Sequence, residues 1–467
     1  MFSKYLESRR EFCRELVNRL APDFEYISIL GKTISGNRVT VTTKLTAVKE
    51  NPITQSGFVA KLYDGKIYSE YSFTDITEKN MDDLERKIRE SVCFSGRLLE
   101  NCVDSRAMRD EPLEKDFERK GQGRKRSIPE VIEELTAIKD SVHAVSDRII
   151  HVEVFYEQYD VAALFVSKNR MLTQSYSWNS IYSMATARDG EIMQQTAEAA
   201  TGNDTDKVFE EMKCKASGLG KLAVELLGAG MIEPGVYDII TTPVVTGLIA
   251  HEAFGHGVEM DMFVKQRAKA RKYVGGRVAS DLVNMHDGAR AVESCVGYFF
   301  DDDGVLAQDT LVIRNGILQT GISDALSAMQ LGTEPTGNGR REDLSRKSYS
   351  RMTNTFFAPG KDKLEDMIAS VKHGYMLFEE YNGMEDPKNW NIQCVVQYGR
   401  EIRDGKFTGK IVAPVVMSGY VPDLLQSISM VSDEWEVIGI GYCGKGYKEW
   451  IPVSDGGPYL KARCKLG

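Results

Sequence analysis

The chain has 467 residues, of which 42% are hydrophobic and 27% charged, with 13 Pro and 41 Gly. This composition excludes a disordered, collagen-like or small disulfide-rich protein and provides apolar residues for two or three cores. Lys and Arg total 59 against 68 Asp and Glu, a formal charge of -9. No global positive field is available for phosphate backbones, so we expect no nucleic-acid partner. Only six residues are histidines, which makes any close pair of them informative.

The first ten residues include four charged side chains and lack the apolar core of a signal peptide. No apolar run approaches the ~20 residues that span a bilayer, so we expect a soluble protein with no membrane partner. The eight cysteines are far apart and form no CxxC motif, which is typical of reduced thiols in a cytoplasmic protein. We therefore predict a cytoplasmic location.

The first part of the chain alternates helical and strand-like patterns. Apolar residues at helical spacing predict a helix over 6–20, and a second helix is predicted over 81–92. Between them, the runs 57–63 and 66–71 flank Asp64-Gly65, which predicts a hairpin with a type I′ turn. An α+β arrangement with mostly antiparallel pairing follows from these patterns.

A charge-dense segment covers residues 104–127 and includes the basic run 119–126. In an acidic chain we interpret it as a solvated linker at a subdomain joint, and nucleic-acid binding by the basic run is the lesser alternative. After it, the patterns predict helices over 128–139 and 204–227, with strands between them. The Gly/Pro cluster at 228–235 predicts a domain boundary, giving domains 1–228 and 229–467.

The second half is predicted to be rich in strands. Strand-like runs occur at 297–300, 311–313 and 435–440, and the first two lead directly into turns. The acidic run 301–303 lacks the spaced ligands and closing glutamate of an EF-hand, so a turn is favoured over a calcium loop. We therefore expect an N-terminal α+β domain and a strand-rich C-terminal domain that carries one important helix.

Two of the six histidines lie in the sequence His251-Glu252-Ala253-Phe254-Gly255-His256. Thr242 and Pro243 form a good N-cap and first turn, which places both histidines on a helix. In HExxH the histidines are four apart and share one Zn²⁺, but five residues of regular helix separate the rings by about 140°. A one-residue π-bulge would bring both rings to one side. The alternative is two histidines with a core or surface role.

A catalytic Zn²⁺ usually has three protein ligands. The spacing does not identify the third ligand, for which the candidates are Glu259, Asp261, His286 and Cys443. Cys443 has the most suggestive setting, because it follows a predicted strand, is flanked by glycines and lies near Lys445. A buried, inert thiol is the alternative for this residue.

The segment 251–259, together with Tyr442-Cys443-Gly444-Lys445, resembles the TldD/PmbA family of peptidases, specifically its metal-binding TldD branch. Further similar segments follow in the family's order: 279–283, 302–304, 336–340, 351–355 and 455–458. The resemblance implies that His251, His256 and Cys443 bind zinc and that Glu252 is the general base. The family's PmbA (TldE) branch lacks the HExxxH residues. After Cys443 the chain departs from the usual family pattern, which leaves the substrate-binding residues unidentified.

Together, the residues and the resemblance predict a zinc-dependent metallopeptidase that hydrolyses unstructured peptides. The many strands suit binding of an extended peptide by strand addition. The alternative is a non-catalytic peptide-binding or regulatory subunit of a TldD/TldE-like complex. The resemblance also implies a dimer, either a homodimer or a heterodimer with a paralogue.

Overall fold

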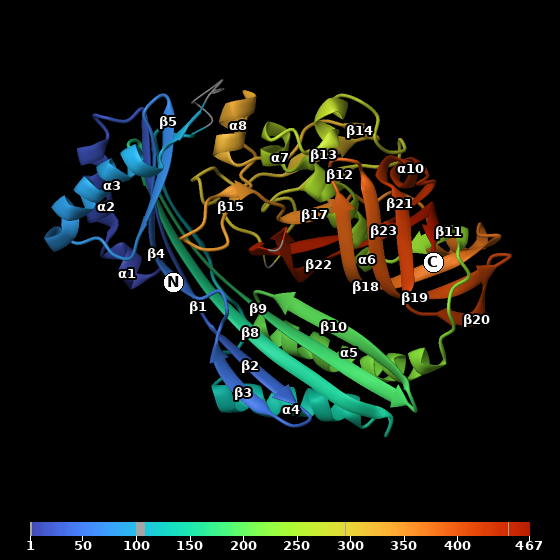
Figure 1. Ribbon diagram of the computed structural model, residues 1–467. Helices are drawn as coiled ribbons and strands as arrows, with labels where there is room; N and C mark the ends of the chain where they lie inside the picture. Colours follow the sequence, from blue (N-terminus) through green and yellow to red (C-terminus); the bar gives the residue numbers. More distant parts are fainter. Residues whose placement is uncertain (1, 100–107, 295, 447) are drawn as a thin grey trace.

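Two large β-sheets organise the chain in the computed structural model, which describes residues 2–99, 108–294, 296–446 and 448–467 (Figure 1). The first sheet has ten strands, all from the part of the chain before residue 203. The second has eleven strands, all from residue 235 onward, and a two-stranded ribbon accompanies it. The α+β fold class predicted from the sequence is confirmed.

The first sheet has the strand order β10-β9-β8-β1-β4-β5-β6, with β2, β3 and β7 off this path. Its longest strands, β8 and β9, form one antiparallel hairpin. The elements of this part are α1 (Lys4–Glu7), α2 (Arg10–Leu20), β1 (Tyr26–Ser35), β2 (Asn37–Thr42), β3 (Thr46–Glu50), β4 (Gln55–Tyr63), β5 (Ile67–Phe73), α3 (Met81–Ser95), β6 (Arg97–Leu98), β7 (Leu113–Arg119), α4 (Ile128–His143), β8 (Ile149–Ser167), β9 (Arg170–Asp189), β10 (Ile192–Gly202) and α5 (Thr205–Glu225).

The first sheet buries apolar side chains on both of its faces. Neighbouring residues of a strand point to opposite faces, so adjacent apolar residues pack in different cores. Ile29 and Leu164 pack in the cluster formed with α2 and α3, whereas the adjacent Leu30 and Phe165 pack against Phe300 of the second half. Figure 1 shows α1–α3 beside one end of this long, curved sheet and α4 and α5 beside the other. The opposite face is therefore available to the C-terminal part of the chain.

The predicted hairpin at Asp64-Gly65 is present, since β4 pairs with β5 in antiparallel register. Its turn is not type I′. The Asp64 N–H donates to the Ile67 carbonyl, so Gly65 and Lys66 are the central residues, and only Gly65 has a positive φ, of 96°. A type I′ turn needs positive φ at both central positions.

The predicted linker over 104–127 is partly a strand. Residues 113–119 form β7, which pairs in parallel with β9, while residues 104–107 lie outside the described part of the chain. The basic run that follows is neutralised locally: Arg126 contacts Glu134 at 2.7 Å and Asp206 at 2.9 Å, and Arg124 pairs with Glu130. These partners leave little of the charge that nucleic acid would need.

The second sheet contains a closed ring. Its order is β11-β18-β19-β21-β23-β17-β12-β13-β14, and β11 also pairs with β23. The elements are β11 (Gly235–Thr241), α6 (Pro243–Leu248), a π-helix (Ile249–Gly255), a 3-10 turn (His256–Val258), α7 (Met260–Val264), β12 (Met285–Asp287), β13 (Thr310–Arg314), β14 (Ile317–Leu318), α8 (Ala325–Leu331), β15 (Gly339–Arg340), β16 (Tyr349–Ser350), β17 (Asn354–Phe357), α9 (Leu364–Ala369), β18 (His373–Asp386), β19 (Asn391–Arg403), β20 (Lys406–Val412), β21 (Val415–Tyr420), α10 (Val421–Gln426), β22 (Met430–Lys445) and β23 (Lys448–Leu466).

The predicted strand at 297–300 is not formed. Phe300 makes only an isolated bridge with Leu306 across the turn that carries Asp301–Asp303. This acidic turn joins the two halves of the molecule: Asp302 accepts from Lys32 at 2.8 Å, and Asp303 forms a buried ion pair with Lys61. The run is thus a turn, as predicted, and the carboxylates of Asp302 and Asp303 bind protein cations of the first sheet.

The six cysteines in the described part of the chain, at positions 13, 93, 214, 394, 443 and 464, are all free thiols, as predicted. Cys102 and Cys295 lie outside the described residues. Across the described ranges, no helix combines the length and the apolar character needed to cross a membrane.

Candidate metal centre

The two histidines of the motif lie on a distorted helix. Thr242 is the N-cap and Pro243 the first residue of α6, and the helix then widens into a π-helix over Ile249–Gly255. The His256 N–H donates to the His251 carbonyl, which is the five-residue hydrogen bond that defines a π-turn. The ring centroids therefore lie only 5.2 Å apart, although regular helical spacing would separate the rings.

Glycines allow this helix to approach its neighbours closely. A Cβ at position 247 would lie 2.6 Å from the backbone nitrogen of Gly456, and one at 255 would lie 2.1 Å from the Met352 sulfur. A Cβ atom is essentially never found this close to another heavy atom, so a larger residue at either position would force its neighbours to move. The glycines thus seat the π-helix against β23 and against the loop that precedes β17.

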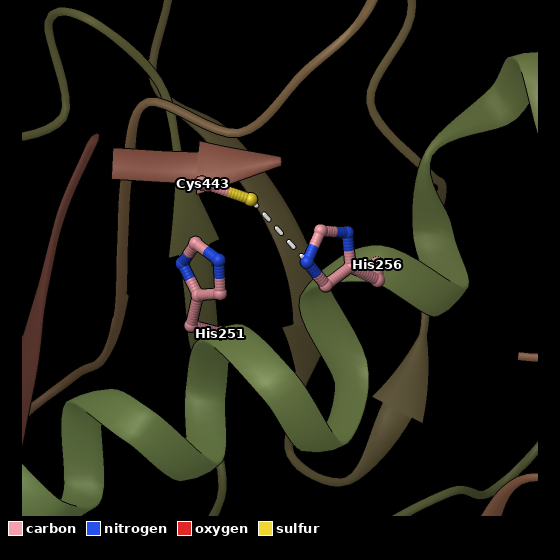
Figure 2. A group of neighbouring side chains, drawn as sticks. All are labelled: His251, His256 and Cys443. Atoms are coloured by element: carbon pink, nitrogen blue, oxygen red, sulfur yellow. Dashed lines mark hydrogen bonds between the residues drawn. The ribbon is translucent and has the colours of Figure 1, made fainter. Parts of the chain in front are cut away.

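The two histidines converge with Cys443, which comes from β22 (Figure 2). The ligand atoms of these three residues all lie within 4.8 Å of one another, and the Cys443 Sγ is 3.3 Å from the His256 Nε2. Two imidazole nitrogens and a thiolate are a donor set that suits Zn²⁺, leaving a fourth position open. Cys443 lies within β22 and not beyond its end, at a register shift between Cys443 and Lys445.

The other third-ligand candidates have different partners. The His286 Nδ1 is 2.7 Å from the Asp309 carboxylate, and its ring stacks on Phe356. Asp261 accepts hydrogen bonds from Lys265 and Lys445. None of these contacts involves the histidine pair.

The sequence also offers Glu259 as a candidate ligand. In the structure its carboxylate contacts the His256 Nδ1, whereas the Nε2 of the same ring faces Cys443. Its carboxylate is 3.3 Å from the His256 Nδ1 and 3.1 Å from the Lys445 Nζ, and its side chain is 1% exposed. A carboxylate at one imidazole nitrogen fixes the tautomer and orients the other nitrogen towards a metal. Burial opposes ionisation, but Lys445 and His256 outweigh it and lower the pKa of Glu259.

The thiol and the imidazoles also influence one another's protonation. Burial opposes a charged Cys443, but the His256 and His251 rings outweigh it and hold the pKa of Cys443 well below its ordinary value. Burial likewise disfavours a charged His251, yet the Cys443 thiolate raises the pKa of His251 to about 9. These contacts favour the thiolate form of Cys443, which is the form that binds metals.

Glu252 lines the same cleft as the three converging residues. This cleft has a volume of about 800 Å³, and β18 forms its opposite wall. Gly383 of β18 faces Glu252, because a Cβ at 383 would lie 2.3 Å from the Glu252 Cγ. The carboxylate and the candidate metal ligands are thus accessible from one open space.

A second cavity, of about 460 Å³, continues from the cleft between β10, β18 and β22. The two spaces share Glu380, Tyr381, Gly441 and Asp455. Their lining is strongly acidic: it includes Glu198, Glu379, Glu385 and Glu436 in addition to the shared acids. Together the two cavities form a channel that concentrates carboxyl groups. Burial raises the pKa of several of them, including Glu380 and Glu385.

The sequence interpretation missed two groups in this region. Glu385 lines the cleft with both carboxylate oxygens buried and without a hydrogen-bond partner. Arg351 is 1% exposed and donates to Glu259 and Cys443. No local pattern marks either residue, since strand β18 carries several acids and Arg351 lies in an irregular loop.

Comparison with known proteins gives the family. Residues 234–464 match the model described as the PmbA/TldA metallopeptidase C-terminal domain. A metalloprotease of Methanothermobacter thermautotrophicus is 28% identical over 330 residues, which cover 70% of this chain and 72% of the relative. A protein named zinc metalloprotease TldD homolog, from Saccharolobus solfataricus, is 26% identical over 358 residues, covering 76% of this chain and 78% of the relative.

The fold is shared with a solved structure. TldE from Thermococcus kodakarensis superposes with a TM-score of 0.72 and 16% sequence identity, covering 98% of this chain and all of that one. At this identity the likeness concerns the fold alone. The domain match and the relatives agree with the segments that resemble the family in the sequence. The chain therefore belongs to the TldD/PmbA family of metallopeptidases.

Proposed function

We propose that this protein is a zinc-dependent peptidase that hydrolyses extended, unstructured peptide segments. The observation that carries the proposal is the convergence of His251, His256 and Cys443 in a cleft that also contains Glu252. Members of the family named as metalloproteases support the reaction class.

The donor atoms fit Zn²⁺. Bond lengths of about 2.0 Å to nitrogen and 2.3 Å to sulfur in a tetrahedron place a nitrogen and a sulfur ligand roughly 3.5 Å apart, close to the 3.3 Å between the His256 Nε2 and the Cys443 Sγ. The His251 Nδ1 is buried and has no hydrogen-bond partner. When bound, zinc supplies a Lewis acid that acidifies water and polarises the scissile carbonyl.

Glu252 is the general base in this proposal. Its carboxylate removes a proton from the attacking water and returns it to the nitrogen of the leaving amine. Glu259 contacts the His256 Nδ1 and orients that ring, whereas Asp455 lies 3.6 Å from the His251 Nδ1, beyond hydrogen-bond distance. The Glu259 carboxylate is already engaged by His256, Lys445 and Arg351.

An extended peptide suits the channel. Among the described strands, β10 ends the first sheet and β22 pairs only with β23, so each has a free edge. The cavity of about 460 Å³ lies between these edges and opens into the cleft. A peptide strand pairing with either edge would reach the cleft through main-chain hydrogen bonds, which favours unstructured segments over folded proteins.

The proposed assembly is a dimer, either of two copies or with a paralogue of the TldE type. The fold likeness to TldE supports the second form. The mass of the purified protein by light scattering, alone and mixed with a paralogue from the same genome, distinguishes the two forms.

Substitution of Glu252 with glutamine tests the reaction. The variant and the wild-type protein are analysed for zinc and incubated with a quenched-fluorescent library of unstructured peptides. We expect about one zinc per chain in both and hydrolysis only by the wild type. Equal hydrolysis by E252Q would refute the role of Glu252. A zinc-free, inactive wild type would favour the alternative, a non-catalytic peptide-binding or regulatory subunit.

A further inference from the structure

Arg351 is a buried cation in direct contact with a candidate metal ligand. Its Nη2 donates to the Cys443 Sγ at 3.1 Å and to the Cys443 carbonyl at 2.9 Å. Its Nε donates to Glu259 at 3.1 Å, and its Nη1 donates to the Glu449 carbonyl. Every nitrogen of the guanidinium is therefore used, and the side chain is only 1% exposed.

Hydrogen bonds with Asn338 hold the backbone of Arg351 in place. The Arg351 N–H donates to the Asn338 carbonyl at 2.9 Å, and the Asn338 side chain donates back to the Arg351 carbonyl at 3.0 Å. Asn338 itself is fully buried. The guanidinium consequently has a fixed direction towards the sulfur.

We propose that Arg351 is a positioning residue that adjusts the electron donation of the Cys443 thiolate to the bound metal. A charge-assisted hydrogen bond to sulfur withdraws electron density from it. A thiolate ligand donates more charge to a metal than an imidazole does, so this contact restores part of the Lewis acidity that the cysteine removes. Arg351 also links two of the candidate ligands. It contacts Cys443 directly, and it contacts Glu259, which orients His256.

The inference rests on the proposed metal site, and its test does not depend on peptidase activity. Co²⁺ replaces Zn²⁺ in the wild type and in R351M, R351K and C443A, and the thiolate-to-cobalt charge-transfer band is recorded. We expect the band to move to lower energy in R351M and by a smaller amount in R351K. Metal affinity should fall by about 10- to 100-fold in R351M, because Cys443 and Glu259 lose the donor that holds them in position.

Arg340 provides a matched control. It is a buried arginine of the same region that donates to the Met352 and Pro452 carbonyls without contacting Cys443. R340M should lose stability without moving the band. If R351M does not fold, R351K alone decides, because lysine keeps the charge but cannot serve all the acceptors of the guanidinium.

The outcomes separate this inference from the proposed function. A wild-type band that is absent, or one that persists in C443A, overturns the metal site itself. A normal wild-type band that stays at the same energy in both Arg351 variants overturns only the role of Arg351. A shift in R340M equal to that in R351M also overturns it, because the effect would then be general to buried arginines of this region.

Discussion

Replacing Gly383 with alanine moves Glu252 without removing any side chain of the site. A Cβ at 383 would lie 2.3 Å from the Glu252 Cγ and 3.0 Å from both its Cβ and its Cδ. Ordinary contacts begin near 3.4 Å, so the glutamate must shift by roughly 1 Å. Gly383 does not have a positive φ, and the backbone therefore accepts alanine.

The size of the effect follows from this shift. A displacement of about 1 Å of a reacting group costs on the order of 100-fold in rate. We expect kcat/KM for peptide hydrolysis to fall by about that factor, while the zinc content stays at the wild-type value because no ligand has moved. Steady-state kinetics and metal analysis of the same preparation measure both quantities.

Gly419→Ala is the control, since Gly419 lies in β21 of the same sheet and a Cβ there meets no atom within 4 Å. It should behave as the wild type. Wild-type kcat/KM in G383A would contradict the reasoning, because the base would then act from a position that the alanine does not disturb. Loss of zinc in G383A would show that the effect reaches the ligands.

Three further predictions concern the metal and stability. His256→Ala and Cys443→Ala should each be purified with well under one zinc per chain by mass spectrometry, and a full complement in either would exclude that ligand. Lys61→Met leaves the carboxylate of Asp303 buried without its cation and should lower the free energy of unfolding by about 3–5 kcal/mol in urea titrations; an unchanged midpoint would refute the importance of this pair. Burial and neighbouring carboxylates raise the pKa of Glu379 from its ordinary 4.5 to about 7, so its favourable contribution is complete below about pH 4.5 and is lost as the pH rises through 7. Glu379→Gln should therefore stabilise the protein at pH 8 more than at pH 5, and equal effects at both values would contradict the shift.

Much of the local structure is predictable from the sequence. Helical and alternating periodicities indicate α2, α4 and α5 and the hairpin of β4 and β5, because each depends on residues close together in the chain. The predictions fail where a strand pairs with another strand that is distant in the sequence. Residues 113–119 carry the charges of a linker but pair with β9, and a register of this kind leaves no local signal.

Some features of the candidate metal centre are likewise predictable from the sequence, and others are not. The HExxxH spacing requires a distorted helix if both rings are to share a metal, and the structure has a π-helix at that position. The residues alone leave four candidates for the third ligand, and only the family resemblance selects Cys443. The Cys443 sulfur meets His256 across 187 residues of sequence, a contact made by β22 and not by any local pattern.

The sequence by itself determined the α+β class, the helix with the two histidines and the need for a π-turn, because backbone propensities and residue spacing act over a few residues. Only the tertiary structure shows that Glu259 contacts the His256 Nδ1 and that the buried Arg351 donates to the Cys443 sulfur. It also shows that β18 brings Gly383 next to Glu252. These contacts depend on how separate strands and loops pack around one cleft. Burial and hydrogen bonding, which give each side chain its chemistry, are properties of that packing.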